Sequence, residues 1–135
     1  MKLEQLAKLT NSTIERGSPD LEITSTAGLD IAGPGDVSFL ANPKYTPQVA
    51  QTKASAIFLN ENVVVERTDI AVIRAKDAYV AYTHAMRLFF PESAIKPFIH
   101  PAAVIDPTAT VADDVEIHAN AVIGANCTIA SGVRI

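Results

Sequence analysis

Two aromatic residues and an amide stand three positions apart in one short segment: Phe39, Asn42 and Tyr45. Two aromatic rings near a chain reversal can sandwich a flat heterocycle, and stacking contributes roughly 1–3 kcal/mol per base. An asparagine offers both a donor and an acceptor to the edge of that base. Lys44 lies beside them, and a mobile ammonium suits a diphosphate without strict geometry. These residue types predict a nucleotide site; the alternative is that both rings pack in a core or turn and that Lys44 is solvated.

The elements around this segment are a turn, a strand and a short helix. Residues 33–36 read Gly-Pro-Gly-Asp, a strong turn signal, and the mostly apolar residues 37–40 that follow predict a strand. Pro43 ends that strand, because proline lacks a backbone donor and restricts the residue before it. Pro47 suits the first turn of a helix over residues 47–53. The candidate side chains are therefore expected at a strand end and in the turn behind it.

The rest of the N-terminal part predicts an α+β domain. Leucines at three-residue spacing in residues 2–10 share one helical face. Alternating apolar and polar residues on both sides of a Gly-Ser-Pro-Asp turn predict a hairpin between 13–16 and 21–24. An amphipathic stretch with Asp77 as its N-cap predicts a second helix that ends at Phe89. Mostly apolar runs predict further strands, buried on both faces, over residues 54–59, 63–65 and 70–73, and residues 91–97 read as a linker.

The last third of the chain repeats every six residues. An Ile or Val occupies each sixth position, at Ile99, Ile105, Val111, Ile117, Ile123, Ile129 and Ile135. A smaller apolar residue follows four places later, at Ala103, Ala109, Val115, Ala121, Cys127 and Val133. A fixed hexad predicts a solenoid in which short parallel strands stack around one core. Three six-residue faces close one coil, so residues 99–116 and 117–134 are expected to form two coils.

Several residues of the repeat have a predicted place but no predicted chemistry. Polar residues and a glycine are expected at the corners, where unusual backbone angles occur, at Asp113, Asp114, Asn120, Asn126 and Gly132. Cys127 falls on the small inward position and is expected to be a buried packing thiol. His100 and His118 are expected at the surface or at corners of the coils, and His84 on the surface of the second helix or at an interface between the domains. The sequence predicts no metal site and no cofactor.

Composition narrows the class of protein. A content of 48% apolar and 19% charged residues is typical of a globular protein. The length of 135 residues allows one domain and a short second unit. A net charge of −4 argues against nucleic acid as the main partner. The single cysteine excludes an internal disulfide. The start of the chain lacks the apolar segment of a signal peptide, and no apolar run reaches the roughly 20 residues that span a bilayer. We expect a cytoplasmic protein without an integral membrane segment.

The hexads resemble those of the hexapeptide-repeat acyltransferases, whose left-handed parallel β-helices trimerise. Together with the N-terminal segment they resemble the N-terminal part of the UDP-3-O-acylglucosamine N-acyltransferase family of the lipid A pathway. The resemblance rests on a leucine-rich opening helix and on the motifs Pro34-Gly35-Asp36, Ser38-Phe39, Asn42-Pro43-Lys44-Tyr45, Asp77-Ala78-Tyr79 and Ile99-His100-Pro101. It implies an α+β uridine-binding domain over residues 1–96. It also implies that residues 97–135 are the first two coils of a left-handed parallel β-helix.

The resemblance assigns roles to the candidate residues. Phe39 and Tyr45 match the aromatic residues that flank uracil, Asn42 matches the polar residue beside it, and Lys44 is a weaker candidate for the diphosphate. The family transfers a 3-hydroxyacyl group from acyl carrier protein to the 2-amine of UDP-3-O-(3-hydroxyacyl)glucosamine, as a homotrimer. The amine must lose a proton, and the family's histidine base lies in coils beyond Ile135. No catalytic residue is therefore assigned here, and these 135 residues alone are expected to bind nucleotide without transferring an acyl group.

Two other interpretations stay open at this stage. One is a non-catalytic module, in which a short β-helix trimerises and the first domain binds a ligand. The other, less favoured, is the UDP-binding domain of the UDP-muramoyl peptide ligases, which Pro34-Gly35-Asp36 before an apolar strand also resembles. Those ligases continue into a phosphate-binding loop of the Gly-x-x-x-x-Gly-Lys-Ser/Thr type. The sequence has no such loop, and the hexads argue against that continuation.

Overall fold

The computed structural model describes every residue from Met1 to Ile135. The chain forms two compact units, Met1–Pro91 and Glu92–Ile135, and the division falls inside the expected linker. None of the helices is both long enough and apolar enough to cross a bilayer.

The first unit is built on a five-stranded sheet with the strand order β1-β5-β4-β3-β2. The strands are β1 (Thr13–Arg16), β2 (Ser25–Thr26), β3 (Asp36–Leu40), β4 (Ala56–Asn60) and β5 (Ala71–Ala75). Neighbouring strands run parallel, except that β1 runs antiparallel to β5. The helices are α1 (Leu3–Leu9), the 3₁₀ turn η1 (Pro43–Tyr45), α2 (Thr46–Val49) and α3 (Ala78–Phe89).

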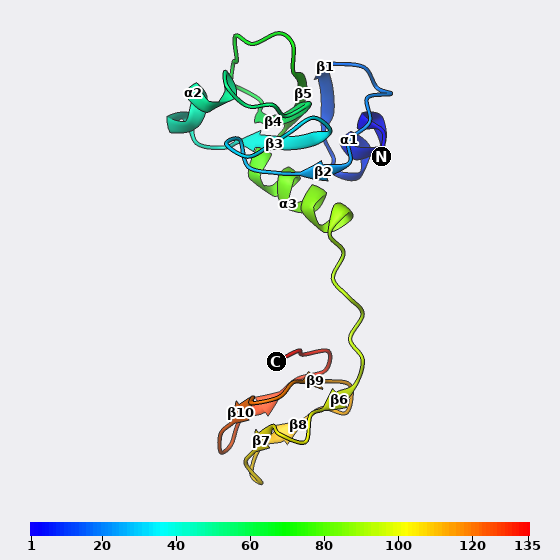
Figure 1. Cartoon of the computed structure of the whole chain (residues 1–135), viewed down its shortest axis with the longest axis vertical. Coiled ribbons are helices and arrows are strands. Elements are labelled where there is room, and N and C mark those ends of the chain that lie inside the picture. Colours follow the sequence, from blue (N-terminus) through cyan, green and yellow to red (C-terminus); the bar gives the residue numbers. More distant parts are fainter. The chain divides into compact units, whose positions relative to one another are not determined.

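Both faces of this sheet are covered, so its central strands are apolar throughout. In β4, Ala56 and Phe58 join the core beneath α1 and α3, while Ile57 and Leu59 face the core that includes Val49 of α2. All four side chains are fully buried. Figure 1 shows α3 running along one side of the sheet and α2 beyond the end of β3. Successive strand residues point to opposite faces, which gives two separate apolar layers from one continuous run.

Most elements of this unit are found where the sequence predicts them. The strand at residues 37–40 is β3, and those at 54–59 and 70–73 are β4 and β5, each shifted toward its C-terminal end by one or two residues. Asp77 caps α3 as predicted, because its Oδ1 accepts hydrogen bonds from the backbone N–H groups of Tyr79 and Val80 at 2.9 and 3.1 Å.

The predicted hairpin between 13–16 and 21–24 is wrong. β1 pairs instead with β5, where Ile14 lies opposite Ile73. Gly17, with φ of 116°, turns the chain, and a Cβ there would lie 2.6 Å from the Cβ of Ala71. The residues after the turn pass beside the N-terminus, where the amide of Leu3 donates to the carbonyl of Leu21 at 2.8 Å. A distant apolar strand therefore displaces the local partner.

Two further predictions near α2 are wrong. The helix expected over residues 47–53 is shorter, because the Arg67 guanidinium donates to the carbonyls of Val49 and Thr52 and ends it. Residues 63–65 form no strand. The carbonyl of Val63 accepts from the Arg74 guanidinium instead of from a neighbouring strand, and Val64 is exposed. In both places an arginine side chain satisfies carbonyls that the regular element would have used.

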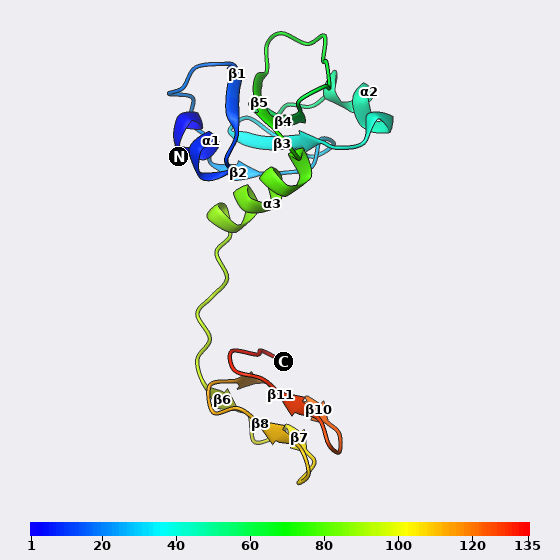
Figure 2. The same ribbon diagram turned by 180° about the vertical axis from the view of Figure 1, so that it is seen from behind.

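The second unit consists of short parallel strands. Each strand pairs with the strand whose residues lie eighteen positions away in the sequence. They are β6 (Phe98–Ile99), β7 (Val104–Ile105), β8 (Thr110–Val111), β9 (Glu116–Ile117), β10 (Val122–Ile123) and β11 (Thr128–Ile129). The ladders join β6 to β9, β7 to β10 and β8 to β11 (Figure 1 and Figure 2). The 18-residue register is that of two three-faced coils, as the hexads predict. Left-handed backbone angles occur at Asn120, Asn126 and Gly132, which the sequence places at corners.

Only part of the interior of these coils is shielded from solvent. Ile117 and Ile123 are buried, whereas Ile99 and Ile135, at the same hexad position in the first and last turns, are 48% and 43% exposed. Cys127 is exposed, so the prediction of a buried thiol is wrong. Ile117 and Ile123 belong to the same coil and are buried, so an inward hexad position is not by itself enough to bury a side chain.

The outward residues differ among the three ladders. Val104 and Val122 stack on the β7–β10 face and are 61% and 75% exposed. The β8–β11 face presents Thr110 and Thr128. The third face carries charge, since the carboxylate of Glu116 accepts from Arg134 at 3.0 Å. The β7–β10 face is therefore apolar and the β8–β11 face polar, while the third face is mixed, since Phe98 lies beside Glu116 on it and is 47% exposed.

Candidate functional site

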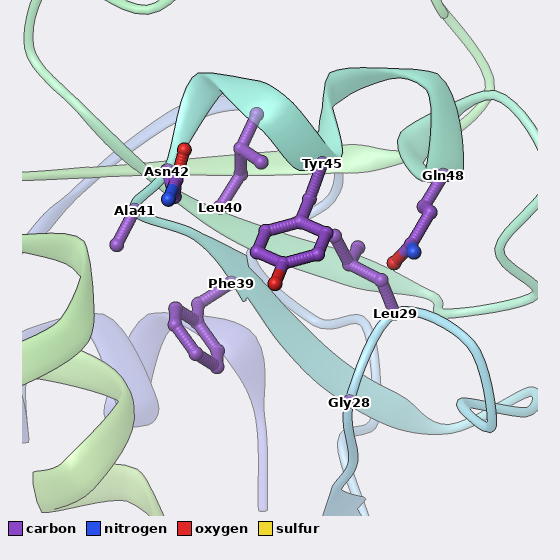
Figure 3. A pocket seen from close by; sticks show the side chains of 8 residues that line it. All are labelled: Gly28, Leu29, Phe39, Leu40, Ala41, Asn42, Tyr45 and Gln48. Carbon is purple, nitrogen blue, oxygen red and sulfur yellow. The ribbon is translucent and has the colours of Figure 1, made fainter.

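A cavity of about 210 Å³ opens at the C-terminal end of β3. Its wall is formed by β3, the η1–α2 segment and the loop before β3, and the lining residues are Gly28, Leu29, Phe39, Leu40, Ala41, Asn42, Tyr45 and Gln48 (Figure 3). Phe39, Asn42 and Tyr45, which the sequence singles out, are thus brought to one pocket. Lys44 belongs to the same turn but does not line the cavity.

Phe39 is held in place from behind. It is the fourth residue of β3 and points to the face that α3 covers. The ring of Tyr82, a buried residue of α3, lies 4.4 Å from the Phe39 ring, and that of Tyr79 lies 5.6 Å away. Such contacts restrict the ring and occupy part of its surface. Phe39 therefore belongs to the core and to the pocket wall at once.

Asn42 and Tyr45 are set by the turn that follows β3. Asn42 has extended backbone angles and caps η1, since its side-chain oxygen accepts from the backbone N–H of Lys44 at 3.0 Å. Pro43 occupies the first position of the turn, where its missing N–H costs nothing. The amide of Tyr45 donates to the carbonyl of Asn42 at 3.0 Å, and Tyr45 remains 45% exposed. The turn thus presents one amide and one aromatic ring to the same space.

The pocket includes residues that the sequence does not single out. Gln48 extends from α2 toward the pocket, and its position continues the three-residue spacing of Asn42 and Tyr45 (Figure 3). Gln48 could have been predicted from this spacing, because residues three apart share a helical face. Gly28 and Leu29 come from the loop before β3 and carry no motif. Only the packing of that loop against the sheet brings them to the site.

The chemistry of the lining suits a small neutral ring. Among the lining residues only Tyr45 has an ionisable group, and the polar side chains are the carboxamides of Asn42 and Gln48. The volume is below the roughly 300–1,000 Å³ of most ligand pockets. A single heterocycle with hydrogen-bonding groups on its edge fits this description. The charged part of a larger ligand would lie outside the cavity.

The histidines lie elsewhere. His84 is exposed on α3, and His100 accepts from the backbone N–H of Ala102 at 3.0 Å. His118 lies 2.9 Å from the carboxylate of Glu116. The pKa of the Glu116 carboxyl is lowered, first by the hydrogen bond from the Lys96 backbone amide and then by Arg134 and His118. None of the three histidines lines the cavity.

Comparison with known proteins identifies the family. The model of UDP-3-O-(3-hydroxymyristoyl) glucosamine N-acyltransferase, LpxD, matches residues 20–88, which include the whole cavity lining. The chain belongs to the UDP-3-O-acylglucosamine N-acyltransferase family. A second model, the bacterial transferase hexapeptide of six repeats, matches residues 96–135 and so covers the stacked coils.

Individual relatives of this family agree. A UDP-3-O-acylglucosamine N-acyltransferase of Pseudomonas syringae pv. syringae is 41% identical over 134 residues, which is 99% of this chain and 36% of that protein. One from Koribacter versatilis is 36% identical over 119 residues, 87% of this chain and 35% of that protein. One from Neisseria meningitidis serogroup B is 37% identical over 115 residues, 85% of this chain and 33% of that protein. The chain spans about a third of the length of these relatives.

Proposed function

We propose that the first unit binds the uracil ring of a UDP-sugar in the cavity at the end of β3. The observation that carries this proposal is the convergence of Phe39, Tyr45 and Asn42 on one pocket of single-ring size. The two rings come from different elements, and Phe39 packs against Tyr82 and not against Tyr45. A flat base between them gains stacking on two faces, at roughly 1–3 kcal/mol per base. Asn42 then meets the edge of the base.

The ribose and diphosphate would extend out of the cavity toward solvent. Lys44 lies in the same turn, one residue before Tyr45, and its exposed ammonium is the nearest cationic group in the sequence. We assign it a supporting role in holding the diphosphate. A flexible exposed lysine contributes less than the stacked rings, because most of its attraction is screened by water.

The reaction we propose for the whole protein is N-acylation in the lipid A pathway, in the cytoplasm. A 3-hydroxyacyl group passes from the thioester of acyl carrier protein to the 2-amine of UDP-3-O-(3-hydroxyacyl)glucosamine. The amine nitrogen forms the new amide bond, the thioester C–S bond breaks, and a base takes the amine proton. The family names of the relatives support this proposal. Residues 1–135 on their own would bind the nucleotide part without catalysing the transfer.

We further propose that the hexad coils wind left-handed and assemble as a homotrimer. Support comes from the match to the hexapeptide model and from the outward faces of the coils. The exposed Val104–Val122 ladder is the apolar one of the three faces and the one that gains most from being covered. A non-catalytic binding module remains the second function, and acyl transfer by the full-length protein would exclude it. The ligase alternative is disfavoured, because residues 96–135 match the hexapeptide model where a phosphate-binding loop would be needed.

Isothermal titration of residues 1–135 with UDP and UDP-N-acetylglucosamine tests the site. We expect both ligands to bind, and Tyr45→Ala to weaken binding at least tenfold, since a tenfold change is about 1.4 kcal/mol and lies within the stacking range. Phe39→Ala should do the same. Phe90→Ala is a matched control, because Phe90 is exposed and does not line the cavity. Failure of a folded sample to bind either nucleotide would disprove the proposal.

A further inference from the structure

We infer that Arg67, which lies outside the cavity, is a positioning residue for nucleotide binding, because its guanidinium fastens the η1–α2 segment to the rest of the first unit. The inference rests on the proposed function, namely that the cavity holds a nucleotide. It goes further in assigning a role in binding to a side chain that does not line the cavity.

The segment from residue 42 to residue 52, called the pocket segment below, has few attachments. It supplies the polar side chains of the cavity, which are those of Asn42, Tyr45 and Gln48 (Figure 3). Residues 42–48 are all exposed, and the buried side chains of the segment are those of Val49 and Thr52. The backbone hydrogen bonds of residues 42–52 stay within the segment. A surface segment held in this way opens locally at a low cost in free energy.

Arg67 provides the polar attachment of the pocket segment. Its guanidinium donates to the carbonyl of Val49 at 3.1 Å and to the carbonyl of Thr52, both near the C-terminal end of α2. Carbonyls at a helix end have no partner within the helix, and a cation there is attracted to the negative end of the helix dipole. The other hydrogen bond that leaves the segment joins the Thr52 hydroxyl to the amide of Ala54, two residues further on.

Arg67 can act as an anchor because it is held from two sides. Its guanidinium donates to both oxygens of the Asp69 carboxylate, at 2.7 and 2.9 Å, and this contact lowers the pKa of the Asp69 carboxyl. The Arg16 guanidinium, from β1, donates to the carbonyls of Arg67 and Ile70 at 2.6 and 3.1 Å. Arg16 and Asp69 therefore fix Arg67 at the edge of the sheet, and Arg67 fixes the pocket segment to them.

This attachment affects binding because a base can stack on Tyr45 only while the pocket segment is in place. The apparent dissociation constant rises in inverse proportion to the fraction of molecules in which the segment is in place. A fraction of about one tenth would therefore raise it about tenfold. The sheet itself should change little, because Val49 is the one residue of the segment in its apolar cores.

Titration of UDP against Arg67→Ala and Arg74→Ala, both in residues 1–135, tests the inference. Arg74 is a matched control, because its guanidinium also donates to two carbonyls, those of Asn60 and Val63, and to the Glu15 carboxylate. The two arginine side chains are 21% and 18% exposed, but Arg74 holds no part of the pocket segment. We expect Arg67→Ala to weaken UDP binding at least tenfold and Arg74→Ala to stay within about twofold of the native affinity.

Further measurements separate positioning from a general loss of structure. Hydrogen exchange in peptides from residues 41–53 should be faster in Arg67→Ala and unchanged in Arg74→Ala. Arg67→Lys should recover part of the affinity, because an ammonium can still donate to one of the carbonyls. Asp69→Asn keeps Arg67 but weakens its hold, so its loss of affinity should lie between those of the two alanine variants. Thermal melting establishes that each variant is folded.

The outcomes distinguish the inference from the proposed function. If Arg67→Ala binds UDP as the native chain does, or both alanine variants lose the same affinity, the inference is wrong while the uridine site stands. Should Arg67→Ala fail to fold, Arg67→Lys and Asp69→Asn decide, and native affinity in both would overturn the inference. If a folded native sample binds no UDP, the proposed function fails and the inference fails with it.

Discussion

The two units of this chain bury their apolar residues in different ways. In the first unit a sheet is covered on both faces, and its two cores contain many fully buried side chains, from Leu3 to Ala85. In the second, only Val115, Ile117 and Ile123 reach that degree of burial. A sheet with helices on it encloses its own core, whereas a coil depends on the coils next to it. The cavity lies in the unit whose core is complete, where a ring such as Phe39 has rigid support.

The largest expected effect comes from the centre of the sheet. Phe58 is fully buried in β4, so Phe58→Ala should cost roughly 3–5 kcal/mol of the free energy of unfolding of the first unit. All three tyrosines lie in this unit and the chain has no tryptophan, so tyrosine fluorescence during urea unfolding reports on it alone. Phe90→Ala, at an exposed position, should change the midpoint little. Equal losses in the two variants would mean that the buried core does not hold the unit.

The second prediction compares two residues of the same hexad position. Ile117→Ala should destabilise the coils by roughly 2–5 kcal/mol, because its side chain is fully buried. Ile135→Ala, at a half-exposed position, should cost less than about 1 kcal/mol. Hydrogen exchange followed by mass spectrometry on peptides from residues 92–135 measures both. Similar protection in the two variants would show that the position in the stack does not determine its contribution.

A smaller effect is expected at the cap of α3. Asp77→Ala removes the acceptor for the amides of Tyr79 and Val80 and should cost about 1 kcal/mol in the first unit. Since α3 carries Tyr82 behind Phe39, the same variant tests whether the pocket depends on that helix. Urea unfolding measures the stability, and titration with UDP measures the site. Asp77→Asn keeps a capping oxygen and should restore most of the stability; a loss as large as that of alanine would contradict the capping role.

The smallest effect is one of pH. Hydrogen bonds hold the pKa of Glu116 in the second unit below the ordinary value of 4.5, and the ion pair with Arg74 does the same for Glu15 in the first. A carboxyl with a lowered folded pKa contributes stability that is complete above its unfolded pKa and is lost as the pH falls through the folded value. These two carboxyls should therefore lower the free energy of unfolding of their units only when the pH falls below 4.5, the ordinary pKa of a glutamate.

Variants separate the two contributions. Glu116→Gln should flatten the acid dependence of exchange in residues 92–135 and leave the tyrosine signal of the first unit unchanged, and Glu15→Gln should do the reverse. The Glu15 side chain is 47% exposed and that of Glu116 only 15%, so we expect a small change for Glu15 that shrinks in high salt and a change for Glu116 that is less sensitive to salt. A change in both units from either variant would show that the units are energetically coupled.

Local patterns predict what local contacts determine. The hexads predict the parallel coils and their 18-residue register, and the turn chemistry around Pro43 brings Asn42 and Tyr45 to the pocket together with Phe39. The errors occur where a distant partner decides. β1 pairs with β5 across the fold instead of with its neighbour in sequence. Arginine side chains donate hydrogen bonds to the carbonyls of Thr52 and Val63, and no local sequence pattern predicts these bonds.

The same limit applies to the site. Gln48 continues the three-residue spacing of Asn42 and Tyr45, so it could be predicted from the sequence. Gly28 and Leu29 line the cavity only because their loop packs against the sheet. Cys127 occupies an inward hexad position, yet it is exposed, whereas Ile117 and Ile123 of the same coil are buried. A repeat pattern predicts the direction of a side chain. It does not predict the number of neighbours that will cover it.

Each coil strand pairs with the strand that lies eighteen residues away in the sequence. This spacing restricts how this part of the gene can change in length. Losing one codon within a coil would move every later isoleucine off its ladder, and the side chains would exchange core for solvent. Loss or gain of six residues would keep the apolar pattern but rotate the valine, threonine and charged faces by one position. Only the loss or gain of whole coils, or the insertion of a loop at a corner, preserves both the apolar pattern and the positions of the three faces. Over evolution, length should therefore vary here in steps of eighteen residues or by insertions at corners such as Asn120.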